Sequence, residues 1–286
     1  MKYLSLFSGI GGLDMGLEEL GHECIGYSEI RKSSIDIYAS HYPERVNFGD
    51  ITKIDIAALP DFDIVTGGFP CQSFSLAGLR KGMNDPRGVM ILHIYNILVQ
   101  KKPKYFVLEN VRGLLTHGKG QTYIKIHKLL ANAGYKVRVL LLNAMHYGSV
   151  QHRERLVFLG SRDDFPVKKP VVVDGSKRFM DVRDTEADKS YEQKDFSELA
   201  NYDLDLIGDH DRVGTLMTVT GCGNKMVAVG ENFRKLSPLE CERIQNFPDG
   251  WTSGAKEKDR YWALGNAVNC NMSRYLFTDY LKGLWW

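Results

Sequence analysis

The sequence predicts an α/β fold in which a doubly wound, mostly parallel sheet forms a large domain. Three observations support this prediction. Short apolar runs recur through residues 1–160, segments with helical spacing separate them, and a glycine-rich turn follows the first run. In such sheets ligands bind beyond the carboxyl ends of the strands, so the residues that follow each strand are the candidates for chemistry.

The individual elements follow from local patterns. The first strand, 3–7, is apolar and runs into the glycine-rich turn 8–12. Apolar residues then recur at helical spacing through 13–20, and Gly21 suits the end of that helix. Pro43 stops a second helix. By the same patterns, further strands are expected at 22–28, 62–66, 105–108, 137–142 and 156–160, and helices at 33–42, 89–100 and 120–133.

Three regions are expected along the chain: 1–161, 162–232 and 233–286. Residues 162–212 have nine Lys or Arg and fourteen Asp or Glu, so this stretch carries a net charge of −5 and the rest of the chain +7. It has little periodicity, which predicts either a small α+β lobe or a partly mobile insert. Regular patterning resumes at Phe233, and Ser237 followed by Pro238 predicts the start of a helix.

Composition argues against several classes of protein. The 286 residues are 43% hydrophobic, enough for one sizeable core and a small second lobe. No run of eighteen apolar residues and no secretory signal is found, so no membrane span is expected. The five cysteines include no C-x-x-C pair, which argues against a zinc site or disulfide framework and favours a reducing cytosol. A net charge of +2 does not by itself indicate nucleic acid.

The glycine-rich turn is a candidate nucleotide or adenosyl site. It presents backbone N–H groups and a helix N-terminus to a ligand, although a dinucleotide site or a simple tight turn would have the same pattern. Glu29 ends the second predicted strand, where a carboxylate could bind two ribose hydroxyls. Asp50 is a third candidate. Both acids could equally be solvated carboxylates at helix starts.

Other residues that follow strands are candidates for catalysis. Cys71 lies in a Gly- and Pro-containing loop after a buried strand, which suits a nucleophile, although a free cysteine is more often a small core residue. Glu109 ends the next apolar strand and could donate a proton or simply cap a helix. In the segment 151–155, alternation would put Gln151, Arg153 and Arg155 on one face. Two guanidiniums there suit a phosphate or a carbonyl oxygen, unless they form an ordinary surface charge run.

The order of these motifs is more specific than any one of them. FSGIGG, Glu29, GDI, GFPCQSFS, ENVRG, QHRER, LSPLECERIQNFPD and LGNAV together resemble the motif series of the C5-cytosine-specific DNA methyltransferases of bacteria and phages. The resemblance covers about four-fifths of the chain, all except 162–212. Asn246 departs from it, because the family has glycine there, and so does HIYNIL after Arg87, which lacks the usual acidic and basic pair.

The resemblance implies a Rossmann-like, class I S-adenosylmethionine-dependent methyltransferase fold and a defined chemistry. Cys71 would add to C6 of a flipped-out cytosine, Glu109 would act at N3, and Arg155 with Arg153 would hold O2 and the neighbouring phosphate. Loop 72–87 would close as a lid. The cofactor would be S-adenosylmethionine, giving S-adenosylhomocysteine, with no metal. Its expected contacts are Phe7, Gly9, Gly11, Glu29, Ile30, Asp50, Ile51, Pro70, Met90, Asn266 and Val268.

The same resemblance makes 1–161 the catalytic, cofactor-binding domain, 162–232 a short target-recognition region, and 233–286 helices that return to the catalytic domain. It implies duplex DNA as partner, a cognate restriction endonuclease as a candidate partner, no membrane contact, a monomer, and a place in the bacterial cytosol or on a phage genome. The alternatives are a tRNA cytosine-5 methyltransferase of the same fold, a DNA-binding regulator without catalysis, and, from the glycine turn alone, a dehydrogenase.

Overall fold

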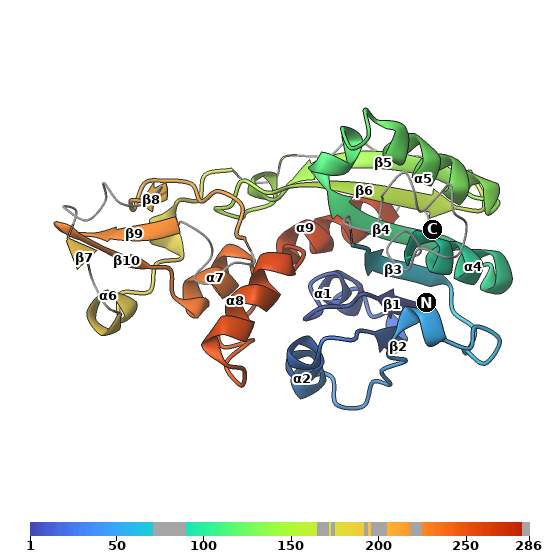
Figure 1. Cartoon of the computed structure of the whole chain (residues 1–286), viewed down its shortest axis with the longest axis horizontal. Helices are drawn as coiled ribbons and strands as arrows, with labels where there is room; N and C mark the ends of the chain where they lie inside the picture. Colours follow the sequence, from blue (N-terminus) through green and yellow to red (C-terminus); the bar gives the residue numbers. More distant parts are fainter. Residues whose placement is uncertain are drawn as a thin grey trace.

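A six-stranded mixed sheet forms the centre of the large domain (Figure 1). In the computed structural model, which describes residues 1–70, 90–164, 172, 175–191, 194–195, 205–217 and 225–281, its strand order is β2-β1-β3-β4-β6-β5. β1 to β4 pair in parallel, and β6 runs antiparallel between β4 and β5. The strands are β1 (Lys2–Leu6), β2 (Glu23–Ser28), β3 (Ile64–Gly68), β4 (Tyr105–Val111), β5 (Lys136–Asn143) and β6 (Glu154–Ser161).

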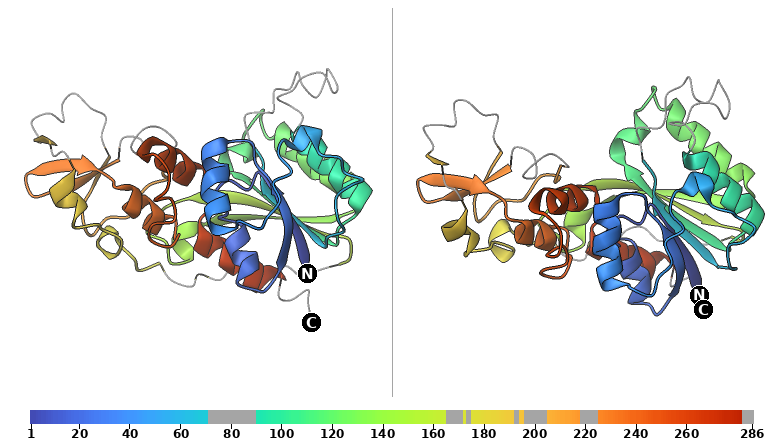
Figure 2. Two further views of the ribbon diagram at one scale, coloured as in Figure 1. Left: turned by 90° about the horizontal axis from the view of Figure 1, so that it is seen from below. Right: turned by 60° about the horizontal axis from the view of Figure 1, so that its bottom comes forward.

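Helices cover both faces of this sheet, as Figure 2 shows. Successive strand residues point to opposite faces. Phe106 and Leu108 of β4 therefore pack with α4 (Met90–Lys101) and α5 (Gln121–Asn132), whereas Val107 packs with α1 (Asp14–Glu18) and the C-terminal helices. The buried side chains of α4 and α5 recur at helical spacing, at 91, 94, 97 and 98 and at 122, 126 and 130. These are the helical patterns that the sequence predicts.

The C-terminal segment returns to the glycine-rich turn. It consists of α7 (Pro238–Ile244), α8 (Glu257–Asn266), α9 (Cys270–Tyr275) and a π-helix (Leu276–Leu281). A Cβ on Gly12 would lie 2.3 Å from the Val268 carbonyl oxygen, and one on Gly16 would lie 2.6 Å from Ser273 Oγ. Ser273 Oγ also donates to the Leu13 carbonyl at 2.9 Å. Glycines at 12 and 16 thus allow the two ends of the chain to pack together.

A second, four-stranded sheet lies apart from the first, with C-terminal helices between them (Figures 1 and 2). Its order is β7-β10-β9-β8, and α6 (Ala187–Ser190) lies beside it. The predicted boundary at 232 falls inside the β9–β10 hairpin, so this small sheet extends to Lys235. Its strands are β7 (Lys194–Asp195), β8 (Asp205–Ile207), β9 (Lys225–Val229) and β10 (Asn232–Lys235).

Short helical turns and one longer helix complete the described chain. α2 (Lys32–His41) follows β2 and packs against α8. Within the described ranges, no helix is both long and apolar enough to cross a membrane. The 3-10 helices are η1 (Ile51–Lys53), η4 (Arg112–Leu115), η5 (Ala144–His146) and η6 (Phe179–Asp181).

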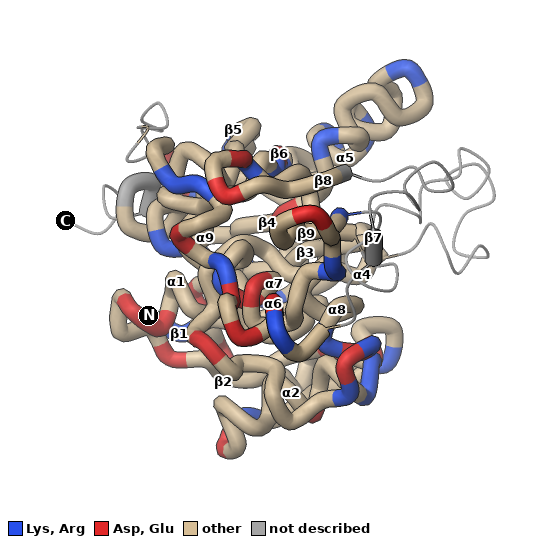
Figure 3. The backbone as a smooth tube through the Cα atoms, turned by 90° about the vertical axis from the view of Figure 1, so that its left-hand side faces the viewer, with Lys and Arg blue, Asp and Glu red and all other residues tan. Residues whose placement is uncertain are grey.

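A buried ion network joins the small sheet to α7. The Arg234 side chain is fully buried and pairs with Asp188 at 2.6 Å and Glu240 at 2.8 Å. Glu240 also accepts from the Ser237 backbone N–H at 2.7 Å, while Ser237 Oγ accepts from the Glu240 N–H at 3.1 Å. This capping box confirms the helix start predicted at Ser237. Figure 3 shows positions of Lys/Arg and Asp/Glu interspersed along the backbone at this end of the molecule. One of the acidic residues of 162–212, Asp188, pairs with both Arg183 and Arg234.

Replacing Arg234 by Met should lower the free energy of unfolding by about 3–5 kcal/mol, because the fully buried Glu240 carboxylate would lose its cation and Asp188 would keep only its pair with Arg183. Urea unfolding followed by circular dichroism would measure the change. Lys32→Ala is a matched control, since Lys32 pairs with Asp36 on the surface with 88% of its side chain exposed and should change stability by less than about 1 kcal/mol. Equal effects of the two substitutions would contradict this interpretation.

Candidate active site

A cavity of ≈ 560 Å³ opens at the carboxyl ends of β1, β3 and β4. The glycine-rich turn forms one wall, and the end of α8 with the loop that follows forms another. It lies where the α/β topology predicts a ligand site. Of the residues expected at the active site, those that line it are Phe7, Gly9, Glu29, Pro70, Glu109, Asn266 and Val268.

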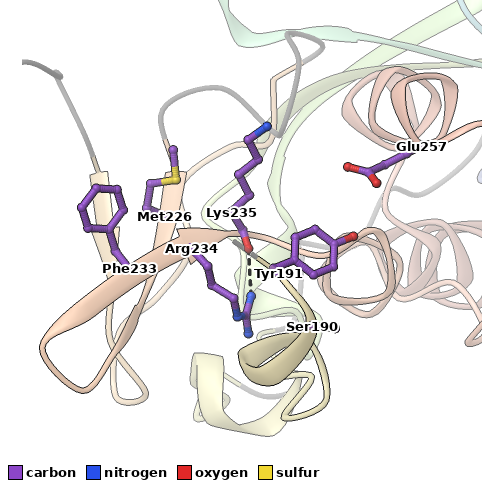
Figure 4. Close-up of a pocket in the computed structure, with 7 residues that line it drawn as sticks. All are labelled: Ser190, Tyr191, Met226, Phe233, Arg234, Lys235 and Glu257. Carbon is purple, nitrogen blue, oxygen red and sulfur yellow. Dashed lines mark hydrogen bonds between the residues drawn. The ribbon is translucent and has the colours of Figure 1, made fainter. Parts of the chain in front are cut away.

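A second cavity, of ≈ 430 Å³, lies between β10 and the N-terminus of α8 (Figure 4). Its polar lining includes Tyr191, Lys235 and Glu257, and the latter two are exposed. None of the residues predicted to be functional lines it. The first cavity is therefore the candidate active site.

The glycine-rich turn is fixed to Glu29. Glu29 Oε2 accepts the Gly9 backbone N–H at 3.0 Å, and Oε1 accepts the N–H groups of Ile30 and Arg31, each at 2.8 Å. Gly9 has φ +55°, and no atom lies within 4 Å of the position a Cβ would occupy, so its backbone faces open space. Ser8 Oγ, also on the wall, is buried without a hydrogen-bond partner in the described part of the chain. The turn thus presents the oriented Glu29 carboxylate and the open backbone at Gly9 to a ligand.

Other predicted cofactor contacts lie outside the cavity itself. The Asp50 carboxylate accepts the Thr52 N–H at 2.9 Å, and this hydrogen bond lowers the pKa of Asp50. Ile30 is 72% exposed and offers apolar surface that a ligand could cover. Gly11 faces the rings of Tyr38 and Tyr42, 3.4 Å from where its Cβ would be. The predicted contacts that do not line the cavity are Gly11, Ile30, Asp50, Ile51 and Met90.

Glu109 and Arg155 form an ion pair at the cavity. Arg155 Nε lies 2.7 Å from Glu109 Oε1, and about a tenth of each side chain is exposed. The register of β4 and β6 explains the pair, because Glu109 lies opposite Val157, two residues from Arg155 on the same face. A Cβ on Gly68 would lie 3.0 Å from Glu109 Oε2, so glycine at 68 leaves room for this carboxylate.

Asn110 positions the loop that leads to the predicted nucleophile. Its buried Nδ2 donates to the Phe69 carbonyl at 2.9 Å, and the next residue, Pro70, lines the cavity. Cys71 follows Pro70 directly in sequence. Cys71 and the predicted lid, 72–87, lie outside the described residues.

Arg153 forms hydrogen bonds with main-chain carbonyls from two distant parts of the chain. Its buried guanidinium donates to three main-chain carbonyls: Leu216 at 3.3 Å, Gly265 at 3.0 Å and Ala267 at 2.8 Å. Arg153 directly precedes β6, which begins at Glu154. Arg153 therefore anchors the C-terminal end of α8 to the connection between β8 and β9.

Several cavity residues were not predicted. Ser8 and Gly12 lie inside the glycine-rich motif, so the motif itself could have indicated them. Trp262 lies one helical turn before Asn266, but an aromatic residue at helical spacing usually indicates core. The unpredicted lining residues are Ser5, Leu6, Ser8, Gly12, Leu13, Ser34, Gly68, Val111, Trp262, Ala263 and Ala267. Among the described residues, no group of three or more His, Cys, Asp or Glu side chains could hold a metal ion.

Asp14 lies buried at the start of α1, behind the glycine-rich turn, and burial raises its pKa to about 6 from an ordinary 3.8. A carboxyl whose pKa is raised by folding favours the folded state below its unfolded pKa, and this contribution is lost as the pH rises through the folded value. Asp14→Asn should therefore be more stable than wild type by about 1–3 kcal/mol at pH 7.5 and nearly equal to it at pH 4. Urea unfolding at both values measures this, and a pH-independent difference would contradict it.

Comparisons with known proteins agree with this fold and site. The family model for C-5 cytosine-specific DNA methylases matches residues 1–215 and 190–282. The chain is 34% identical to the type II methyltransferase M.NlaX of Neisseria lactamica over 93% of this chain and 92% of that one. It is 29% identical to M.HhaI of Haemophilus parahaemolyticus, over 96% and 93% of the two chains.

Solved structures show the same fold. The Entamoeba histolytica methyltransferase EhMeth superposes with a TM-score of 0.81 at 22% identity, covering 98% of each chain. Schizosaccharomyces pombe Dnmt2 gives 0.81 at 22% identity, with 99% of each covered. These likenesses confirm the predicted methyltransferase fold with its mixed, mostly parallel sheet. The chain belongs to the C-5 cytosine-specific DNA methylases, as the motif series predicts.

Proposed function

We propose that this methyltransferase transfers a methyl group from S-adenosylmethionine to C5 of a cytosine flipped out of a short recognition sequence in duplex DNA, with Cys71 as nucleophile. The observation that supports this most directly is the Glu109–Arg155 ion pair at the cavity, beside the loop that leads to Cys71. An acid and a cation fixed next to each other suit a pyrimidine ring, whose N3 and O2 are adjacent.

The chemistry requires a covalent step. Cytosine C5 is a poor nucleophile, so the Cys71 thiolate would add to C6 and move electron density into the ring. Glu109 would share a proton with N3, and Arg155 would donate to O2, which stabilises the charge that develops there. S-adenosylmethionine supplies the methyl group when bound. Loss of the C5 proton and departure of the thiolate would then restore the aromatic ring.

The cavity fits the adenosyl cofactor. The Glu29 carboxylate, oriented by three backbone N–H groups, would accept from the ribose hydroxyls. The open backbone at Gly9 would face the amino acid part. Asn266 and Val268 would contact it from the C-terminal segment. Asp50 and the exposed Ile30 would contact the adenine, next to the cavity.

The substrate and partners follow from the same proposal. A base inside a duplex is inaccessible to Cys71, so the target must be flipped out. The small sheet would read the bases that flank the target cytosine. It lies within the region 162–232 and the adjoining β10. The enzyme would act as a monomer. A cognate restriction endonuclease is a further proposed partner, since M.NlaX and M.HhaI are named as type II methyltransferases.

Transfer of labelled methyl groups tests the proposal. Wild type and Cys71→Ser are incubated with labelled S-adenosylmethionine and either duplex DNA or tRNA, and the DNA product is mapped by bisulfite sequencing. We expect 5-methylcytosine in one recurring DNA context, with none from the variant. Label in tRNA alone would favour the tRNA alternative, and label in DNA at another atom would overturn the proposed reaction.

A further inference from the structure

Trp262 lies on the wall of the cavity, although it precedes the LGNAV motif and no cofactor role was expected for it. It is half-buried and shares the wall with Glu29, Ser34 and Asn266. Asn266, a predicted cofactor contact one turn later in α8, donates through Nδ2 to the Trp262 main-chain carbonyl at 2.9 Å, so the two residues are neighbours on the helix. The indole is therefore in a position to contact a ligand.

The indole is held in place from outside the cavity. The Arg31 guanidinium lies 3.7 Å from the centroid of the Trp262 ring, a cation–π contact. Arg31 is fixed in turn by Asp259, whose Oδ1 lies 3.2 Å from Nη2, and by Ser33, whose Oγ accepts from Nε at 3.1 Å. Asp259, Trp262 and Asn266 are three, then four residues apart, so they share one face of α8. This face lies against the start of α2.

The same arginine connects the indole to the predicted ribose site. The Arg31 backbone N–H donates to Glu29 Oε1, so one residue orients the carboxylate through its main chain and the indole through its side chain. Glu29 and Trp262 both line the cavity, so the two carboxylate oxygens of Glu29 and the indole of Trp262 lie within one binding site. A ribose suits both, because its hydroxyls can donate to the carboxylate and its apolar C–H faces can pack on the indole.

We infer that Trp262 packs against the ribose and the adjoining methionine chain of the bound cofactor, and that Arg31 is a positioning residue that fixes the ring. This inference rests on the proposed function, because it assumes that S-adenosylmethionine occupies the cavity. Trp262 would supply apolar contact area, and Glu29 would supply the hydrogen bonds.

Binding of S-adenosylhomocysteine to the full chain tests the inference without catalysis. By isothermal titration calorimetry, Trp262→Ala should weaken binding about tenfold or more, and Trp262→Phe, which keeps an aromatic face, less than about threefold. Arg31→Met should weaken it about threefold, since it removes the cation on the ring with its bonds to Asp259 and Ser33 but keeps the backbone N–H that orients Glu29. Circular dichroism and thermal unfolding verify that each variant is folded.

Fluorescence gives an independent readout that does not depend on stability. Titrating wild type with S-adenosylhomocysteine should change the tryptophan emission, and Trp262→Phe should abolish that change. Trp251→Phe is the control and should retain it, because Trp251 stacks on His41 and does not line the cavity. An unchanged affinity in Trp262→Ala, with wild type binding normally, would overturn this inference alone. Absence of binding by folded wild type would overturn the proposed function as well.

Discussion

Replacing Glu109 by Gln is expected to lower the rate of methyl transfer by about 10²–10⁴-fold. The amide has nearly the shape of the carboxyl group but cannot exchange a proton with N3 of cytosine. It also removes the charge that faces Arg155 Nε at 2.7 Å, so the guanidinium would lose its fixed orientation toward O2. Because Glu109 lies apart from Glu29 and the glycine-rich turn in the proposed site, affinity for S-adenosylhomocysteine should change less than about threefold.

The rate is measured as labelled methyl transferred to duplex DNA under single-turnover conditions, and the affinity by calorimetry. Glu154→Gln is the matched control. Glu154 lies next to Arg155 at the start of β6, but its side chain pairs with the exposed Arg112 and does not line the cavity. This control should keep its rate within about threefold of wild type. A Glu109→Gln enzyme that retained a tenth of the wild-type rate would exclude Glu109 as the essential acid.

Local periodicity predicts the elements of the large domain but not their neighbours in space. The predicted strand at 105–108 and helix at 89–100 match β4 and α4, because burial on one face imposes a period on the sequence. The antiparallel insertion of β6 between β4 and β5 has no local signal, since it depends on which strand edges remain free. The sequence also does not predict the hairpin of β9 and β10, because its strands are short and the regular pattern resumes only at Phe233, inside β10.

The candidate site likewise combines residues that local sequence patterns predict with residues whose contacts depend on distant parts of the chain. Glu109 and Arg155 are each predicted as site residues from their position at a regular strand, but their pairing depends on the register of β4 against β6, which has no local signal. The partners of Arg153 could not be predicted, because they are carbonyls from segments more than sixty residues away. Trp262 was missed for another reason: only the packing of α8 beside α2 determines that its ring borders a cavity.

The contacts of Arg153 link two parts of the enzyme. Two of its three hydrogen bonds go to Gly265 and Ala267, the neighbours of Asn266 at the C-terminal end of α8, where this helix lines the candidate active-site cavity. The third goes to Leu216 in the connection between β8 and β9. A planar guanidinium can donate to three carbonyls at once, whereas an ammonium cannot match that fixed geometry. The residue should therefore be sensitive even to replacement by lysine.

Arg153→Lys is expected to lower the free energy of unfolding by about 2–4 kcal/mol and to weaken binding of S-adenosylhomocysteine about tenfold. The buried carbonyls would lose donors, and the C-terminal end of α8, with Asn266 and the following Val268, would lose its anchor. Urea unfolding and calorimetry measure the two effects. Arg162→Lys is the matched control, because Arg162 makes one exposed hydrogen bond to Lys102 and should change neither quantity appreciably.

The same variant separates anchoring from the catalytic role that the Gln-x-Arg-x-Arg resemblance assigns to Arg153. A residue that contacts the cytosine or its phosphate would, when replaced, lower the rate with bound DNA and leave stability and cofactor affinity unchanged. Replacing an anchoring residue would instead lower stability and cofactor affinity, and a saturating concentration of cofactor should restore most of the rate. If Arg153→Lys kept full stability but had a reduced rate at saturating cofactor, Arg153 would act on the substrate. That result would contradict the anchoring role derived from its three carbonyl partners.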